Sequence, residues 1–453
     1  MMKKIILYSL LLIHTLLASC SLVNVIDQVP PNDLVPENAI TDEASAELAL
    51  NGVYSYFQRN LNYIKLGAVP AFSSGYLTAN KALLNWEANY EENNARSTTF
   101  DLLDFWTGFY KAINAANTVI AEVGKLPEDK FKGARKEEIL AEAHFLRAMF
   151  HFDLLRYFGE YYKMDSDRGI IIKDTPTTLN TVKTGRSTVK ASYEFIGQEL
   201  EYAIKHAPEF TEPYRVSKWV AKALKARIAL YTGDYTQAAS IAEDVIQNSG
   251  LTLAETYQSF FEQGYNAPGL LFSQGSDQQS QEQDYRFDAY GEGYWSASES
   301  FENVIGDDPR KAMIIGGDAD WGTQLPKLIA ATELQPVYYF RLAEMYLIKA
   351  EALARNGASL SEAQAPFNII RDRAGATLSQ ATNQQELLEE IYKEIVIELG
   401  FENGHEWFAA IRFGKALDLK EEITEAYQYI LPIPLGELQV NDLLSQNPGY
   451  EQE

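Results

Sequence analysis

Two segments of the chain each pair two amphipathic stretches around a central glycine, and this pattern constrains the fold more than any other feature. In residues 217–250, one stretch with helical spacing of apolar residues ends at Gly233-Asp234, and a second stretch follows. Residues 341–375 repeat this arrangement around Gly357. Ser217 is a typical N-cap residue for the first stretch. One such hairpin cannot bury its apolar stripe alone, so the hairpins should stack on one another. The apolar positions are Val220, Leu224, Ile228, Tyr235, Ala238, Ala242, Val245, Tyr346, Ala350, Leu353, Ala363, Phe367 and Ile370.

A helix, a glycine-containing turn and a second helix within about 34 residues is the spacing of tetratricopeptide repeats. Further amphipathic runs cover residues 41–57, 100–123 and 134–158. We therefore predict a mostly α-helical protein with a tetratricopeptide-like scaffold of about four helix pairs. A generic helical bundle is the alternative that the periodicity leaves open.

Two long regions lack helical periodicity. Residues 70–98 are rich in Asn and Tyr, and residues 252–336 are rich in Gly, Gln, Asp, Ser and aromatic residues. An irregular stretch of this length inside a compact protein is usually functional or a separate subdomain. We predict that both are loop-rich insertions and that they form the ligand-binding part of the protein. The tail, residues 418–453, should be extended chain that lies against the body.

The N-terminus has the pattern of a secretory signal. Met1-Met2-Lys3-Lys4 is basic, the following residues are mostly apolar, and the segment ends in Leu17-Ala18-Ser19-Cys20. This ending resembles the lipobox of bacterial lipoproteins, in which the cysteine becomes the acylated first residue of the mature chain. We therefore predict a signal peptide at residues 1–19, lipidation of Cys20, a tether at residues 20–40, and one domain at residues 41–453. An ordinary secreted protein is the alternative.

Charge limits the choice of partners. The chain has 39 Lys and Arg residues against 63 Asp and Glu residues, which gives a formal net charge of −24. An acidic surface repels phosphate backbones, so we predict no nucleic-acid partner. It also disfavours adsorption to anionic lipid, so membrane attachment should depend on the acyl chains at Cys20.

Motifs for catalysis and metal binding are scarce in the sequence. His144 and His151 could share a helix face, but two ligands alone make a weak metal site, and we interpret both as solvated or hydrogen-bonded core residues. Carboxylate pairs such as Glu137-Glu138 and Glu389-Glu390 lie on predicted helix surfaces. We predict a binding protein without cofactor or metal rather than an enzyme. A glycoside hydrolase stays open, because two carboxylates can converge in a cleft from distant positions.

Several segments together resemble the SusD/RagB family of nutrient-binding outer-membrane lipoproteins, over nearly the whole chain. The resemblance rests on residues 141–148 and 153–159 (AEAHFLRA and DLLRYFG), 219–227 with 231–235 (WVAKALKAR and YTGDY), 341–352 with 371–375 (RLAEMYLIKAEA and RDRAG), 398–408 (ELGFENGHEWF), and 431–434 with 446–450 (LPIP and QNPGY). Each motif alone is weak, but their order behind a lipobox is specific.

The resemblance implies a tetratricopeptide-like scaffold with loops that form a ligand face. It also implies a cell-surface protein that acts as a lid on a TonB-dependent, SusC-like outer-membrane transporter and delivers glycan to it. The motif residues belong to the scaffold, so ligand-binding residues do not transfer from the family. Three positions depart from the pattern: Asn403 is inserted, Glu406 replaces an arginine, and an aspartate is missing near Ala409. The first acid after Cys20 is Asp27, so surface display follows from the resemblance alone.

A shallow sugar site needs exposed aromatic rings to stack on apolar C–H faces, together with hydrogen-bonding side chains. We place these in the two irregular regions, and for each ring a place in the core is the alternative. By contrast, Trp106, Trp219 and Trp407 lie on helical stripes and should belong to the core. The predicted ligand-binding residues are Trp86, Asn89, Tyr90, Tyr290, Tyr294, Trp295 and Trp321.

The predicted function is therefore capture of an oligosaccharide or similar nutrient for import. A lipid-anchored repeat scaffold that binds a peptide or protein is the main alternative, since tetratricopeptide repeats commonly bind peptides.

Overall fold

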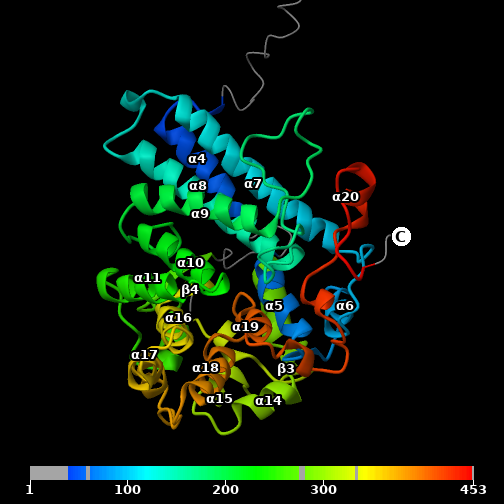
Figure 1. Cartoon of the computed structure of the whole chain (residues 1–453), viewed down its shortest axis with the longest axis vertical. Coiled ribbons are helices and arrows are strands. Elements are labelled where there is room, and N and C mark those ends of the chain that lie inside the picture. Colours follow the sequence, from blue (N-terminus) through cyan, green and yellow to red (C-terminus); the bar gives the residue numbers. More distant parts are fainter. Residues whose placement is uncertain (1–38, 58–61, 275–280, 332–334, 451–453) are drawn as a thin grey trace, which may run out of the picture.

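The computed structural model describes residues 39–57, 62–274, 281–331 and 335–450. Cys20, the signal peptide and nearly all of the tether lie outside the described residues. Helices dominate the described chain (Figure 1), which confirms the predicted fold class. None of the described helices combines the length and apolar character that crossing a membrane requires.

The scaffold is a stack of helices in which neighbours along the chain pack together (Figure 1). Helices α7 and α8, α10 and α11, α16 and α17, and α18 and α19 are consecutive, contacting pairs, as expected for about four helix pairs. Helix α4 packs on α7 and α8, and α9 lies between α8 and α10. The helices of the stack are α4 (Glu43–Tyr54), α7 (Leu102–Lys125), α8 (Arg135–Phe158), α9 (Val189–His206), α10 (Lys218–Tyr231), α11 (Tyr235–Asn248), α16 (Leu342–Arg355), α17 (Leu360–Arg373), α18 (Gln384–Leu399) and α19 (His405–Arg412).

Local chemistry sets the boundaries of the predicted hairpins. The Ser217 side chain accepts a hydrogen bond from the Val220 N–H and caps α10, as predicted. Gly233 and Gly357 adopt positive φ angles of 78° and 75° in the turns, a backbone conformation that residues other than glycine rarely adopt. The hairpin boundaries were therefore readable from residue type alone.

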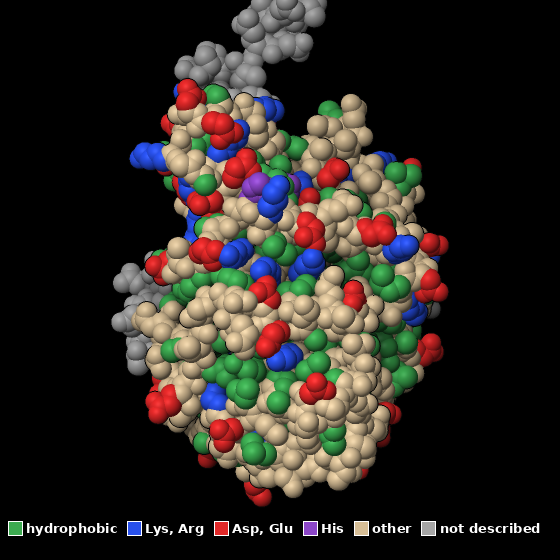
Figure 2. Space-filling view, turned by 60° about the vertical axis from the view of Figure 1, so that its left-hand side comes forward, with side chains coloured by type: hydrophobic (Ala, Val, Ile, Leu, Met, Phe, Trp, Pro, Cys, Tyr) green, Lys and Arg blue, Asp and Glu red, His purple; other side chains and the backbone are tan. Residues whose placement is uncertain are grey.

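The core fills the space between the helices of the stack. Trp106, Trp219 and Trp407 are 2%, 5% and 4% exposed, which confirms their predicted place in it. On the face of the stack drawn in Figure 2, basic and acidic side chains are interspersed, with apolar side chains between them. Ion pairs such as Lys222 with Asp244 link neighbouring helices on the outside of the stack.

The two irregular regions contain more regular structure than the sequence predicts. Strand β1 pairs antiparallel with β3, with Leu77 opposite Ala297 and Ala79 opposite Trp295. Strand β2 pairs antiparallel with β4. Most of these elements have only three to seven residues, which is too short to show a clear period, so the prediction missed them. The elements are α5 (Asn62–Ser73), β1 (Leu77–Ala79), α6 (Glu87–Glu91), α12 (Tyr257–Glu262), β2 (Leu270–Gln274), α13 (Gln281–Tyr290), β3 (Trp295–Ala297), α14 (Glu299–Ile305), α15 (Lys311–Ile314) and β4 (Val337–Arg341).

The C-terminal tail lies against the stack, but it is not extended throughout. It contains a short helix, α20 (Leu435–Val440). The Leu431 N–H donates to the Tyr157 carbonyl at 2.6 Å, and the Asn447 side chain donates to the Phe158 carbonyl at 3.0 Å. The family-like motifs of the tail therefore hold it to the end of α8.

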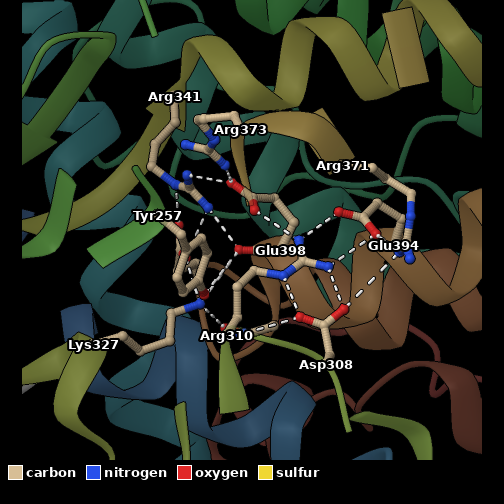
Figure 3. Close-up of polar contacts among 11 residues, drawn as sticks. Tyr257, Asp308, Arg310, Lys327, Arg341, Arg371, Arg373, Glu394 and Glu398 are labelled. Carbon is tan, nitrogen blue, oxygen red and sulfur yellow. Dashed lines mark hydrogen bonds and ion pairs between the residues drawn. The ribbon is translucent and has the colours of Figure 1, made fainter. Parts of the chain in front are cut away.

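A buried network of ion pairs joins the second irregular region to α18 (Figure 3). Glu398 lies at its centre and accepts hydrogen bonds from Arg310 and Arg341, each at 3.0 Å. It also pairs with Arg373. Burial alone would raise the pKa of Glu398, but Arg373, Arg341 and Arg310 lower it to about 2. The network contains Asp308, Arg310, Lys327, Arg341, Arg371, Arg373, Glu394, Glu398 and Glu402.

Glu406, which replaces the expected arginine, is buried in the first turn of α19. One of its carboxylate oxygens accepts from the Phe401 N–H at 3.2 Å, while the other has no partner within the described structure. Burial raises the pKa of Glu406 to about 8. The fold therefore holds this carboxyl neutral at pH values where the unfolded chain has lost the proton.

We expect Glu406→Gln to gain stability relative to the native chain as the pH rises. The folded pKa lies above the unfolded value of 4.5, so the native chain loses stability between pH 4.5 and about 8. A glutamine cannot ionise. The free energy of unfolding of the variant minus that of the native chain should therefore grow by at least about 1 kcal/mol over this range. Urea unfolding at several pH values measures it. Glu421→Gln, at an exposed position, should show no such growth, and a constant difference for Glu406→Gln would contradict the buried neutral acid.

Candidate functional site

Four of the predicted ligand-binding rings lie in the core. Trp86, Tyr90, Tyr290 and Trp295 are each at most 5% exposed. Trp86 and Trp295 have ring centroids 5.6 Å apart, and both rings pack on Phe72. The expectation that these rings project from loops is therefore wrong. They pack on one another, which fixes the first irregular region to the second.

A polar contact explains why Trp295 is held inside. Its indole N–H donates to Glu87 Oε1 at 3.2 Å. The same carboxylate oxygen accepts from the backbone N–H groups of Leu83 and Leu84 at 2.6 and 2.8 Å. Asn89 is half-buried on α6, where its side chain donates to the Trp86 carbonyl at 3.5 Å. The indole N–H of Trp295 is therefore satisfied inside the protein, and the four buried rings offer no free face to a ligand.

The two other predicted rings, Tyr294 and Trp321, meet at the surface. Trp321 is 50% exposed, Tyr294 is half-buried, and their ring centroids are 5.9 Å apart with planes at 82°. The Lys81 ammonium lies 3.9 Å from the Trp321 centroid and 4.4 Å from the Tyr294 centroid. It also donates a hydrogen bond to the Tyr294 hydroxyl at 3.0 Å. We call Lys81, Tyr294 and Trp321 the aromatic platform.

Sequence reasoning found both rings but missed Lys81. The residue follows β1, and the Asn80 and Lys81 N–H groups donate to the Tyr294 carbonyl at 2.8 and 3.2 Å. Successive side chains of an extended segment point to opposite faces, so Tyr294 faces outward while Trp295 faces the core. Without the β1–β3 pairing, no sequence signal places Lys81 next to Tyr294.

Two glycines allow the backbone to bring Trp321 to this place. A Cβ atom on Gly322 would lie 2.1 Å from the Asn80 side-chain nitrogen and 2.5 Å from Ser296 Oγ. Gly293 has φ = 71°, and a Cβ atom there would lie 2.8 Å from the backbone of Gly322. The close approach of the two glycines therefore positions the residues beside them, Tyr294 and Trp321.

If the aromatic platform binds a ligand, Gly322→Ala should weaken that binding several-fold, because the new methyl group must displace Asn80 or the Trp321 loop. Gly317→Ala is the matched control, since it lies in the same loop and its Cβ atom would meet nothing within 4 Å. Calorimetric titration of each variant with a glycan that the native protein binds measures the two affinities. Equal affinity of the two variants would show that the Gly293–Gly322 contact does not position the site.

The histidines have partners of their own. His151 Nδ1 donates to the Arg147 carbonyl at 2.8 Å, and its Nε2 accepts from the Lys173 N–H at 3.2 Å. Burial lowers the pKa of His151 to about 4, so the ring is neutral. His144 contacts Glu199 at 2.8 Å. His151 is thus a hydrogen-bonded core residue, and no group of three or more potential ligands for a metal ion occurs in the described chain.

The stack of helix pairs defines a helical-repeat protein that carries the aromatic platform on its surface. Two family models match the chain: one described as starch-binding and associating with the outer membrane covers residues 27–230, and the SusD family model covers residues 228–423. The chain belongs to the SusD/RagB family, as its motifs predict.

Known relatives resemble the chain over its length. It is 28% identical to SusD-like protein P2 of Formosa agariphila, over 99% of this chain and 100% of that one. A SusD superfamily structure from Bacteroides thetaiotaomicron matches with a TM-score of 0.78 at 23% identity, covering 90% of this chain and all of the other. A structure described as a laminarin binding SusD-like protein matches with a TM-score of 0.73 at 24% identity, covering 91% and 100%. These structural matches establish the shared fold.

Proposed function

We propose that this protein is a lipid-anchored glycan-binding protein that captures oligosaccharide at the aromatic platform and passes it to a TonB-dependent transporter. The observation that carries the proposal is the exposed pair of Tyr294 and Trp321 with Lys81 between them. The starch-binding description of the matching family model and the laminarin-binding relative support glycan as the ligand.

The chemistry of the platform suits a sugar. The exposed Trp321 ring offers a face to the C–H side of a pyranose, and stacking of this kind contributes roughly 0.5–1.5 kcal/mol for each ring. The Lys81 ammonium can donate further hydrogen bonds to sugar hydroxyls, because it has three protons and uses one for Tyr294. A shallow site of this kind gives modest affinity, which suits a protein that must release its ligand to a transporter.

Anchoring and delivery complete the proposal. The matching family model is described as associating with the outer membrane, and an acylated Cys20 would provide the attachment through its lipid chains. We propose surface exposure and a SusC-like barrel as the partner. Metabolic labelling with palmitate, compared with Cys20→Ala, tests the anchor, and purification of the native complex tests the partner. A soluble peptide-binding partner instead of a barrel would favour the peptide-scaffold alternative.

The experiment that tests the function is a calorimetric screen of the purified protein against polysaccharides and peptides. Binding of at least one glycan, without release of reducing sugar on prolonged incubation, is the expected result. Binding of peptides alone would overturn glycan capture. Hydrolysis of a bound glycan would overturn the proposal that the protein binds without catalysis.

A further inference from the structure

A pocket lies between the residues that follow α6 and the C-terminal tail. It has a volume of about 310 Å³, near the lower end of the range for small-molecule sites, which leaves room for one small ligand such as a sugar unit. Residues 93–97, which follow α6, form one wall. Tyr427, Gly449 and Tyr450 of the C-terminal tail form the other wall.

The described residues that line the pocket include one arginine and no carboxylate, in a protein with a net charge of −24. Arg96 lines it and forms no ion pair with any described residue; its Nε donates a long hydrogen bond of 3.4 Å to the Asn94 side chain. A guanidinium group without a carboxylate partner is a strong binding group for a carboxylate or sulfate, because it can donate two parallel hydrogen bonds.

Ser97 adds a second observation that points to a ligand. The residue is only 6% exposed, lines the pocket, and neither its hydroxyl nor its backbone N–H has a hydrogen-bond partner among the described residues. The neighbouring Ala95 N–H is likewise unpartnered within the described chain. The Ser97 hydroxyl is accessible from the pocket, so a bound ligand can accept a hydrogen bond from it. An anion in the pocket would satisfy these donors together with Arg96.

The walls of the pocket are fixed in place. The Asn93 side chain donates to the Ser73 carbonyl at 3.1 Å, and the Ser97 carbonyl accepts from the Leu435 N–H at 2.9 Å. Tyr427 lies flat on Gly449, where a Cβ atom would be 2.3 Å from the ring. A pocket with fixed walls pays little ordering cost when a ligand binds.

We infer that this pocket binds a sugar unit that carries a carboxylate or a sulfate. The anionic group would accept hydrogen bonds from Arg96, the Ser97 hydroxyl and the nearby backbone N–H groups, while Tyr427 and Asn94 would contact the sugar ring. The inference that the ligand is an anion depends on the residues of the pocket alone. The inference that it is a sugar depends on the proposed function. Such a pocket would bias the protein toward acidic glycans.

The test is calorimetric titration with a trigalacturonate, a sulfated trisaccharide, a neutral trisaccharide and inorganic sulfate. An acidic trisaccharide should bind, and Arg96→Gln and Ser97→Ala should each weaken it, with a loss of roughly tenfold for the arginine variant. Comparing trigalacturonate with the sulfated trisaccharide shows whether the pocket prefers a carboxylate or a sulfate. Lys190→Gln removes one charge from an exposed lysine on α9 and should change nothing.

Trp321→Ala separates this inference from the proposed function. Loss of neutral glycan binding in that variant, with acidic binding retained, supports two separate sites. Equal binding of the neutral and acidic trisaccharides by Trp321→Ala, or unchanged acidic binding in Arg96→Gln, would overturn the acidic pocket. Binding of inorganic sulfate as tightly as the sugars would overturn the assignment to a sugar.

Discussion

Glu398→Gln should lower the free energy of unfolding by about 3–5 kcal/mol, the usual cost of removing one partner from a buried ion pair. Glu398 is fully buried and pairs with Arg310, Arg341 and Arg373. The variant leaves these buried guanidinium groups with too little negative charge around them. Urea unfolding followed by circular dichroism measures the loss.

The pH dependence gives this prediction a second check. Because the pKa of Glu398 is lowered to about 2, its stabilisation is present above pH 4.5 and disappears as the pH falls toward 2. The difference between native chain and variant should therefore shrink over that range. Glu389→Gln is the control, since this residue lies on the same helix in an exposed ion pair with Lys415. A loss below about 1 kcal/mol for Glu398→Gln would contradict the central role of the network.

Trp321→Ala should weaken the binding of a neutral glycan by roughly tenfold. Removing the ring forfeits one stacking contact and also releases the Lys81 ammonium, which the ring holds in place at 3.9 Å. Because the side chain is half exposed, the fold should tolerate the change. Calorimetry with a glycan from the screen measures the affinity, and thermal unfolding checks the stability.

Tyr214→Ala is the matched control for this prediction. Tyr214 is also about half exposed, at 48%, but it lies beside Tyr265, outside the platform. Its removal should leave the affinity unchanged. If both variants bind as the native chain does, glycan is held elsewhere.

The scaffold was predictable because its signals are local. Helical spacing of apolar residues, a serine N-cap at Ser217 and glycines at the turns act within a few residues of one another. Trp106, Trp219 and Trp407 lie on helical stripes, so their burial follows from periodicity alone. The family motifs were not needed to predict the helices and turns of this part of the fold.

The site was predictable only in outline, because its geometry depends on contacts between distant segments. Both irregular regions contribute side chains to the aromatic platform, but Lys81 of the first region was not among the predicted residues. However, the pairing of β1 with β3 decides that Tyr294 faces outward and Trp295 inward, and it brings Lys81 to Tyr294. A shift of one residue in that register would exchange the two faces, and a three-residue strand shows no pattern that fixes it.

The buried ionic network shows the same limit. Glu398 and Arg341 belong to motifs that the sequence analysis identified, but their pairing crosses 57 residues of chain. The position of Glu406 was noted as a departure, whereas its burial and its raised pKa became visible only in three dimensions. Charged residues on a helix usually indicate a solvated face, so buried pairs are hidden in the sequence.

A crystal structure of the protein with the tightest neutral glycan from the screen tests the central claim most directly. The account predicts a pyranose ring stacked on Trp321, with sugar hydroxyls within hydrogen-bonding distance of the Lys81 ammonium. A glycan bound in full occupancy at another surface, with Trp321 free, would contradict it.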